Sequence, residues 1–263
     1  MNISTRRSGW RRLARYVGRR LFDLADNNGN PALERNGEAE LLAHVLHGTG
    51  RARPAVVIDA GANRGEYTRL VLSTASRLGI AVRVHAFEPG PDAVTALRAV
   101  CAGHEDVRIE ATGLADYSGE AVLYGGKGAS TLASLVARPI LAGTASVSIP
   151  VTRLDAYLKS AQLEHVDFLK IDVEGSELAA LRGAGDYLRP EVIDAVQFEY
   201  GGTTLDARGS LAEIYQFLEE RGYCIGKLMP REVEIRAYRP WMENFVFSTY
   251  TALHPRWCGE ASG

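Results

Sequence analysis

Short apolar runs alternate with amphipathic segments along most of this chain. The runs "AVVI" and "VDFLKI" are continuously apolar or nearly so, which is typical of strands buried on both faces. Between such runs, apolar residues recur every three or four positions and indicate helices. We expect strands at 55–58, 82–87, 107–111, 121–124, 147–151, 166–171 and 192–198, from about 223, and at 245–250. We expect helices at 37–48, 66–78, 92–100, 154–159, 177–184 and 210–220.

This alternation predicts an α/β fold with a doubly wound, mostly parallel, Rossmann-like sheet. The two strands at 121–124 and 147–151 interrupt it, and we interpret them as a β-hairpin insertion over the carboxyl edge of the sheet. An antiparallel last strand, common at the edge of such sheets, stays an open alternative. The expected organisation is an N-terminal helical extension (1–50), a catalytic domain (51–255) and a short tail (256–263).

The N-terminal segment "RRSGWRRLARYVGRR" holds seven arginines between Arg6 and Arg20 and no acid. Its apolar residues recur at helical spacing and form one stripe: Trp10, Leu13, Val17, Leu21 and Leu24. No apolar core follows the charges, so the segment is not a signal peptide. It predicts an amphipathic helix laid on the domain or, alternatively, a site for an anionic partner such as a carrier protein, a phosphorylated substrate or a membrane surface.

Composition adds few constraints. The net charge of −2 gives no global reason to expect a nucleic acid or an anionic membrane as partner, and no apolar run approaches the ~20 residues of a membrane-spanning helix. Cys101, Cys224 and Cys258 are too few and too scattered for a disulfide framework or a zinc site, so we expect a reducing cytoplasm. A homo-oligomer is left open.

The turn after the first strand, "DAGANRG", is the first candidate for ligand binding. The dinucleotide pattern G-x-G-x-x-G would need a glycine at Asn63, and Gly65 comes one residue early for its third glycine. A pyrophosphate site is therefore disfavoured. Glu88 ends the second strand, 23 residues after Gly65, where a carboxylate can accept both ribose hydroxyls. Together these features indicate a nucleoside-binding α/β enzyme.

A purine next to that ribose would need close backbone approach and an apolar surface. Pro89 stiffens the turn after Glu88, and Gly113 and Leu114 follow the third strand. Asp116 could bond to an adenine amino group or simply cap a turn.

Three acids follow the next two strands: Asp172, Glu174 and Glu199. We expect them to converge on one rim, with Asp172 nearest the reacting group and either Asp172 or Glu199 as proton acceptor. They could instead hold Mg²⁺. The metal-free interpretation is preferred because no third ligand is obvious beside Asp172 and Glu199. The loop between 125 and 151, with Ser130 and Thr131, is expected to close over the acceptor.

Five stretches together resemble the FkbM family of S-adenosylmethionine (SAM)-dependent methyltransferases. They run in the family's order between Val56 and Glu199: "VVIDAGANRGEYT", "HAFEP", "GLADYSGEAVLY", "VTRLDAYL" and "FLKIDVEGSELAALRGA". The resemblance implies a class I methyltransferase fold over 51–255 and O-methylation of a small-molecule hydroxyl, on a sugar or a natural product. It also implies SAM contacts at Asp59, Gly61, Ala62, Asn63, Gly65, Tyr67 and Asp172.

Two other functions compete with methyl transfer. One is an NAD(P)-dependent oxidoreductase on a related sheet, and the other is a nucleoside-binding module without catalysis. Asn63 and the D-V-E-G motif at 172–175 argue against the first. The second predicts that Asp59, Glu88 or Asp172 would be lost, and all three are present.

Overall fold

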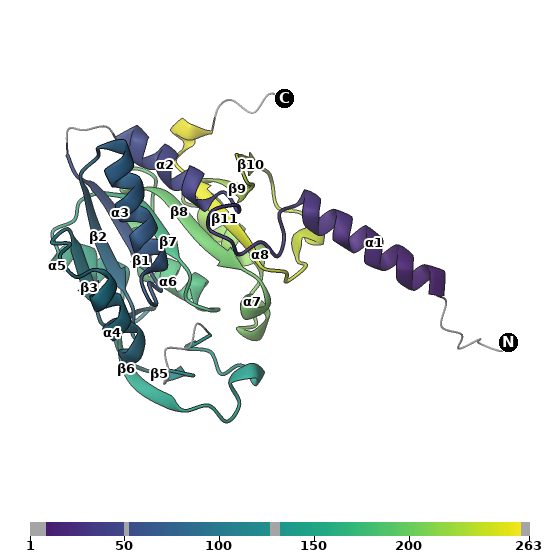
Figure 1. The fold of residues 1–263 in the computed structure, drawn as a ribbon, viewed down its shortest axis with the longest axis horizontal. Helices are drawn as coiled ribbons and strands as arrows, with labels where there is room; N and C mark the ends of the chain where they lie inside the picture. The colour runs from purple at the N-terminus through teal and green to yellow at the C-terminus, as the bar shows by residue number, and fades with distance from the viewer. Residues whose placement is uncertain (1–8, 50–52, 127–131, 259–263) are drawn as a thin grey trace.

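The computed structural model describes residues 9–49, 53–126 and 132–258, and an eight-stranded sheet forms the centre of the molecule (Figure 1). In spatial order its strands are β10 (Val233–Ile235), β9 (Cys224–Leu228), β11 (Ser248–Leu253), β8 (Ile193–Tyr200), β7 (Val166–Ile171), β1 (Ala55–Ala60), β2 (Val82–Phe87) and β3 (Val107–Glu110). Strands β8, β7, β1, β2 and β3 are parallel, which confirms the expected α/β fold.

Helices cover both faces of this sheet. They are α2 (Glu38–Thr49), α3 (Glu66–Leu78), α4 (Pro91–Val100), α5 (Leu154–Ser160), α6 (Glu177–Gly183), α7 (Gly202–Asp206) and α8 (Leu211–Glu219). Short 3₁₀ turns lie at η1 (Pro139–Leu141), η2 (Gly185–Tyr187), η3 (Pro240–Met242) and η4 (Pro255–Trp257). Within β1, Val57 packs with α2 and α3, whereas Val56 and Ile58 pack with α5, α6 and α8. The side chains of this continuous apolar run therefore contribute to two hydrophobic cores, one on each face of the sheet.

The C-terminal part of the sheet agrees with the sequence prediction in direction but not in every boundary. Strand β11 is antiparallel to both β8 and β9, which confirms the alternative of a late antiparallel strand, and it lies between them rather than at an edge. It begins at Ser248 rather than at Phe245, because Phe245 has a φ of 52°, outside the extended region. The short elements α7 and β10 were not expected, and both have too few residues to show a periodicity.

The insertion forms a second, three-stranded sheet in the order β4 (Gly113–Leu114), β6 (Ser146–Thr152) and β5 (Gly119–Tyr124). The expected hairpin is confirmed, since β5 and β6 pair antiparallel. Leu123, Ile149 and Val151 form a small apolar cluster of their own with Ala115. In Figure 1 this sheet lies below the carboxyl ends of β2 and β3.

Helix α1 (Gly9–Ala25) extends away from the body of the molecule, beyond β9, β10 and α8 (Figure 1). All its residues are described and none is buried, so the expectation that it lies on the domain is wrong. Only its end is anchored. Phe22 contacts the Trp241 ring edge-on, and Asp26 is paired with Arg236 at 2.7 Å and with the buried Lys227 at 3.2 Å. No helix within the described ranges is long and apolar enough to cross a membrane.

Candidate functional site

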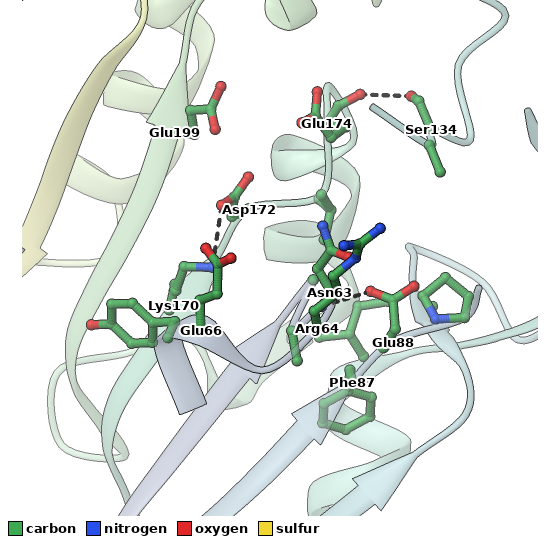
Figure 2. Close-up of a pocket in the computed structure, with 18 of the residues that line it drawn as sticks. Asn63, Arg64, Glu66, Phe87, Glu88, Ser134, Lys170, Asp172, Glu174 and Glu199 are labelled. Carbon is green, nitrogen blue, oxygen red and sulfur yellow. Dashed lines mark hydrogen bonds and ion pairs between the residues drawn. The ribbon is translucent and has the colours of Figure 1, made fainter. Parts of the chain in front are cut away.

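A cavity of about 360 Å³ opens at the carboxyl ends of β1, β2, β7 and β8 (Figure 2). This is where ligands bind in open α/β sheets. Among the residues singled out from the sequence, the cavity is lined by Gly61, Ala62, Asn63, Tyr67, Glu88, Pro89, Gly113, Leu114, Asp172, Glu174 and Glu199. Residues from five separate chain segments therefore meet in one place.

The turn after β1 owes its shape to Gly61. This residue has a φ of 82°, and a Cβ atom there would come within 1.8 Å of the Asp172 carbonyl oxygen. Gly61 thus lets the turns after β1 and β7 approach each other, rather than merely leaving room for a ligand. Asn63, also at positive φ (46°), directs its backbone N–H towards Glu88.

Glu88 is held by two backbone donors. The Asn63 N–H donates to one of its carboxylate oxygens at 2.9 Å, and the Gly90 N–H donates to the other at 2.7 Å. Burial raises the pKa of Glu88, and these two N–H groups partly oppose that shift. A carboxylate oxygen can accept more than one hydrogen bond, so both oxygens retain capacity for a diol in the cavity.

Lys170 is the main feature of the site that sequence reasoning missed. It lies in β7 directly opposite Asp59 of β1, and its ammonium is 3.4 Å from Asp59 and 3.2 Å from Asp172 (Figure 2). Burial by itself lowers the pKa of Lys170, but the carboxylates of Asp172, Asp59 and Glu38 raise it overall. A lone lysine inside the apolar run "VDFLKI" is a signal that could have been read, because lysine is almost never fully buried unless paired.

Three predicted contact residues lie outside the cavity lining, although the structure describes all of them. Asp59 is fully buried, accepts a hydrogen bond from Thr68 at 2.7 Å and reaches the site only through Lys170. A Cβ on Gly65 would point at Leu97 rather than into the cavity. Asp116 is exposed beside β4, outside the residues that enclose the cavity.

The three candidate catalytic acids line one cavity, and the carboxyl groups of Asp172 and Glu199 are close enough to share a hydrogen bond. In Figure 2, Glu199 projects from β8, Glu174 lies on the side of Ser134, and Asp172 lies between them. Burial and the Asp172 charge raise the pKa of Glu199 well above its usual range. Burial also favours protonated Asp172, but the Lys170 ammonium lowers its pKa overall. Burial and Asp172 raise the pKa of Glu174 to about 7, opposed by Arg138.

Within the described residues, the one group of ligand atoms close enough together for a metal ion is elsewhere. It comprises His165, Asp167 and Asp194, at the opposite edge of the sheet, where β7 and β8 begin. Arg53 pairs with Asp167 through two nitrogens at 2.8 Å, and Arg256 pairs with Asp194. Cations of the chain itself neutralise these carboxylates, so the group is an ion-pair network.

The insertion forms one wall of the cavity through Leu123, Ser134 and Leu135. It is fastened to the turn after β7: Ser134 donates to the Glu174 carbonyl oxygen at 2.6 Å, and Arg138 bonds to the Glu174 carboxylate at 2.9 Å. Ser130 and Thr131, expected on the same loop, lie outside the described residues.

Another part of the lining comes from Pro31 and Leu33, between α1 and α2, and from Glu38, the first residue of α2; the sequence analysis did not assign these residues to the site. Glu38 is buried, and its two carboxylate oxygens accept hydrogen bonds from the amides of Asn36 and Gln197, each at 2.6 Å. Burial raises the pKa of Glu38.

Two proteins of known name are similar to this chain. "Methyltransferase 1" of Beauveria bassiana (strain ARSEF 2860) is 28% identical over 194 residues, 66% of this chain and 74% of its own. The 31-O-demethyl-FK506 methyltransferase FkbM of Streptomyces tacrolimicus is 26% identical over 236 residues, 76% of this chain and 87% of its own.

A solved structure has the same fold. The methyltransferase FkbM from Methylobacillus flagellatus KT matches 80% of this chain with a TM-score of 0.50 and 16% identity. The present chain spans 47% of that protein.

The family comparison covers the strands and turns that build the cavity. The model of the methyltransferase FkbM domain matches residues 59–225, from the end of β1 into β9. This match takes in more than half of the chain, and the chain therefore belongs to the FkbM methyltransferase family.

Proposed function

We propose that this methyltransferase uses SAM as its methyl donor and transfers the methyl group to a hydroxyl oxygen of a small molecule. The observation that carries the proposal is the charge of the cavity. Six acidic side chains line it, against Arg64 and Lys170 as the basic ones: Glu38, Glu66, Glu88, Asp172, Glu174 and Glu199. Such a lining favours a cationic ligand with a sulfonium and an ammonium group, and it disfavours the pyrophosphate of NAD(P).

The residues present fit SAM at both of its ends. Glu88 would accept the ribose hydroxyls, because its carboxylate is fixed by the Asn63 and Gly90 N–H groups. Pro89, Gly113 and Leu114 would take the adenine against an apolar wall. Glu38 and Asp172 would lie at the amino-acid end, where Lys170 keeps Asp172 ionised.

When bound, SAM supplies a methyl group that is already activated, so the protein's tasks are positioning and proton removal. The acceptor oxygen gains a bond to carbon as the carbon–sulfur bond breaks, and the hydroxyl proton must go to a base. We assign this role to Glu199, whose raised pKa gives its carboxylate a higher proton affinity than that of Asp172. Asp172 and Glu174 would orient donor and acceptor, and no metal ion is assigned a role.

The relatives and the walls of the cavity support a proposal for the class of acceptor. The Streptomyces tacrolimicus relative is named for methylation of an oxygen on FK506. In this chain the insertion and the segment 31–38 enclose the cavity with both apolar and polar side chains, which suits a hydroxylated natural product or a sugar. We further place the catalytic unit at 51–255, with 1–50 and 256–263 as extensions. The reducing cytoplasm also stays a proposal, resting on the small number and scattered spacing of the three cysteines.

Calorimetry tests the donor. We expect SAM to bind, and Glu88→Ala to weaken its binding by about 1.5–3 kcal/mol, the range for hydrogen bonds to charged groups. Glu105→Ala, at an exposed acid outside the cavity, is the matched control and should leave the affinity unchanged. Unchanged SAM affinity in the Glu88 variant would place the ribose elsewhere, and tighter binding of NAD⁺ than of SAM would point to an oxidoreductase.

Proton release on ligand binding is a second, independent test of the proposed methyl donor. Burial and the negative charge of Asp172 raise the pKa values of Glu38, Glu174 and Glu199. A cation that enters the cavity should therefore lower these pKa values and cause protons to be released. SAM, which carries the sulfonium charge, should therefore release more protons than its neutral-sulfur product. Titrations in buffers of different ionisation enthalpy measure this difference, and equal release by both ligands would contradict a sulfonium held beside these acids.

A further inference from the structure

The exposed face of α1 is the largest feature of the molecule that methyl transfer does not use. Five large apolar side chains on this helix are between 45% and 81% exposed: Trp10, Leu13, Val17, Leu21 and Leu24. At about 100° per residue they fall within one arc of about 80° around the helix. Single exposed apolar residues are ordinary, but a continuous stripe of this size marks an interaction surface.

The rest of the helix circumference is basic. The helix carries Arg11, Arg12, Arg15, Arg19 and Arg20, all exposed, against one acid, Asp23. Arg20 lies near one border of the apolar stripe, and the other four lie on the remaining circumference. Long arginine side chains at such borders can reach sideways to charged groups while the stripe is buried.

The helix is anchored so that the stripe stays accessible. Phe22, which lies outside the stripe on the helix circumference, contacts Trp241, and the Asp26–Arg236 pair fixes the following turn. The remaining turns project away from the body of the molecule (Figure 1). The domain itself therefore does not cover the stripe.

We propose that α1 is an interfacial helix that lies in the surface of an anionic lipid membrane. An anionic membrane surface accommodates both the apolar and the basic face of the helix. The stripe enters the boundary between headgroups and acyl chains, and the arginines contact lipid phosphates. A nucleic acid would neutralise the arginines but leave the stripe in water. A second copy of the helix would cover the stripe but leave the arginines on the opposite side without an anionic partner.

Vesicle binding by the whole protein tests this assignment. The probe is phosphatidylcholine vesicles in which about one third of the lipid is phosphatidylglycerol, compared with phosphatidylcholine alone. Trp10 is a built-in reporter, since the chain has three tryptophans and Trp241→Phe with Trp257→Phe leaves it alone. We expect binding to the anionic vesicles, a blue shift of Trp10 fluorescence, and quenching of that fluorescence by brominated acyl chains.

Two variants separate the contributions of the stripe and of the charges. Leu13→Gln/Val17→Gln/Leu21→Gln should lower the vesicle association constant at least about tenfold. A matched control with three exposed apolar residues elsewhere, Val122→Gln/Ile140→Gln/Leu205→Gln, should not. Arg12→Gln/Arg15→Gln/Arg20→Gln should weaken binding to the anionic vesicles by about fivefold per arginine and reduce the preference over neutral ones accordingly.

The other occupants have distinct signatures. Because no α1 residue is buried, the variants should leave the thermal unfolding midpoint unchanged, so a loss of vesicle binding cannot be attributed to unfolding. Failure of the native protein to bind anionic vesicles overturns the proposal. Binding that survives the stripe variant also overturns it, since the charges alone would then be responsible. A dimer that dissociates in the stripe variant, without vesicle binding, assigns the face to a second copy.

Discussion

Asp172 and Glu199 differ in proton affinity although they lie at the same edge of the sheet. The difference arises from Lys170, whose ammonium lies 3.2 Å from Asp172 and stabilises its anionic form. For Glu199 the main influences on the pKa are burial and the negative charge of Asp172, and both raise it. The pKa values of the two acids are thus shifted in opposite directions, and a lysine that local sequence patterns did not connect with the site lowers that of Asp172.

The first prediction concerns Glu199 as the proton acceptor. Glu199→Gln should slow methyl transfer by roughly 10²–10⁴, with little change in SAM affinity, because an amide cannot accept the proton. The raised pKa means that the ionised form grows with increasing pH, so the wild-type rate should rise with pH and this rise should vanish in the variant. Single-turnover rates over a pH series measure both effects.

Two controls accompany this measurement. Glu191→Gln, at an exposed acid outside the cavity, should keep the wild-type rate and pH profile. A Glu199→Gln enzyme with full activity would remove the role of base from this residue. Activity that is lost in EDTA and restored by Mg²⁺ would assign the acids to a metal instead.

At the scale of elements, the insertion and the turn after β7 behave as one unit. The β4–β6–β5 sheet has its own small apolar cluster and is joined to the main domain by polar contacts at the cavity wall. Arg138 is central to this junction: its side chain is 9% exposed, and it bonds to Glu174 and to Asp206 of α7, each at 2.9 Å. The junction holds the wall that the acceptor would touch.

We expect Arg138→Gln to loosen this wall. Without the guanidinium, the partly buried Glu174 loses the cation that opposes the rise of its pKa, and α7 loses its link to the insertion. The KM for the acceptor should rise roughly tenfold, and amide hydrogen exchange in 132–145 should become faster. Arg182→Gln, at an exposed arginine on α6, is the control. Unchanged exchange in 132–145 would show that Arg138 does not fasten the insertion.

At the scale of the whole molecule, the opposite edge of the sheet holds segments together that are far apart in the chain. His165 lies 3.2 Å from Asp194 and 3.6 Å from Asp167, and Arg53 and Arg256 complete the network. Hydrogen bonds to Asp167 and Asp194 raise the pKa of His165 to about 9. This edge therefore links stability to pH at a distance from the catalytic end.

The last prediction concerns how the free energy of unfolding depends on pH through His165. Because the folded-state pKa of His165 lies above its ordinary value of 6.5, the protonated histidine stabilises the fold fully below about pH 6.5 and loses this effect as pH rises through about 9. His165→Asn should lower the free energy of unfolding by about 2 kcal/mol in acid, after allowance for solvent screening, and by much less above pH 9. Urea denaturation on both sides of this range measures the difference.

His104→Asn, at an exposed histidine without such partners among the contacts described, is the control and should show no comparable trend. A stability difference for the His165 variant that stays constant from acid to alkaline pH would mean that packing, rather than charge, accounts for it.

The sequence by itself determined the parallel strands, the turn after β1 and the position of Glu88 at the end of β2. These features depend on local periods and on the rule that carboxyl ends of parallel strands meet at one edge. The family motifs lie within the same segments, so they also could be read along the chain. The acids after β7 and β8 were placed correctly at the cavity for the same reason.

Only the tertiary structure decided which side chains act together. Asp59 faces Lys170 because β1 and β7, more than a hundred residues apart, pair in one particular register. That register turns an expected ligand contact into a buried ion pair. The insertion of β11 between β8 and β9 likewise depends on long-range pairing that no local period encodes. The amphipathic period of α1 was plain in the sequence, but whether the domain would cover it depended on packing.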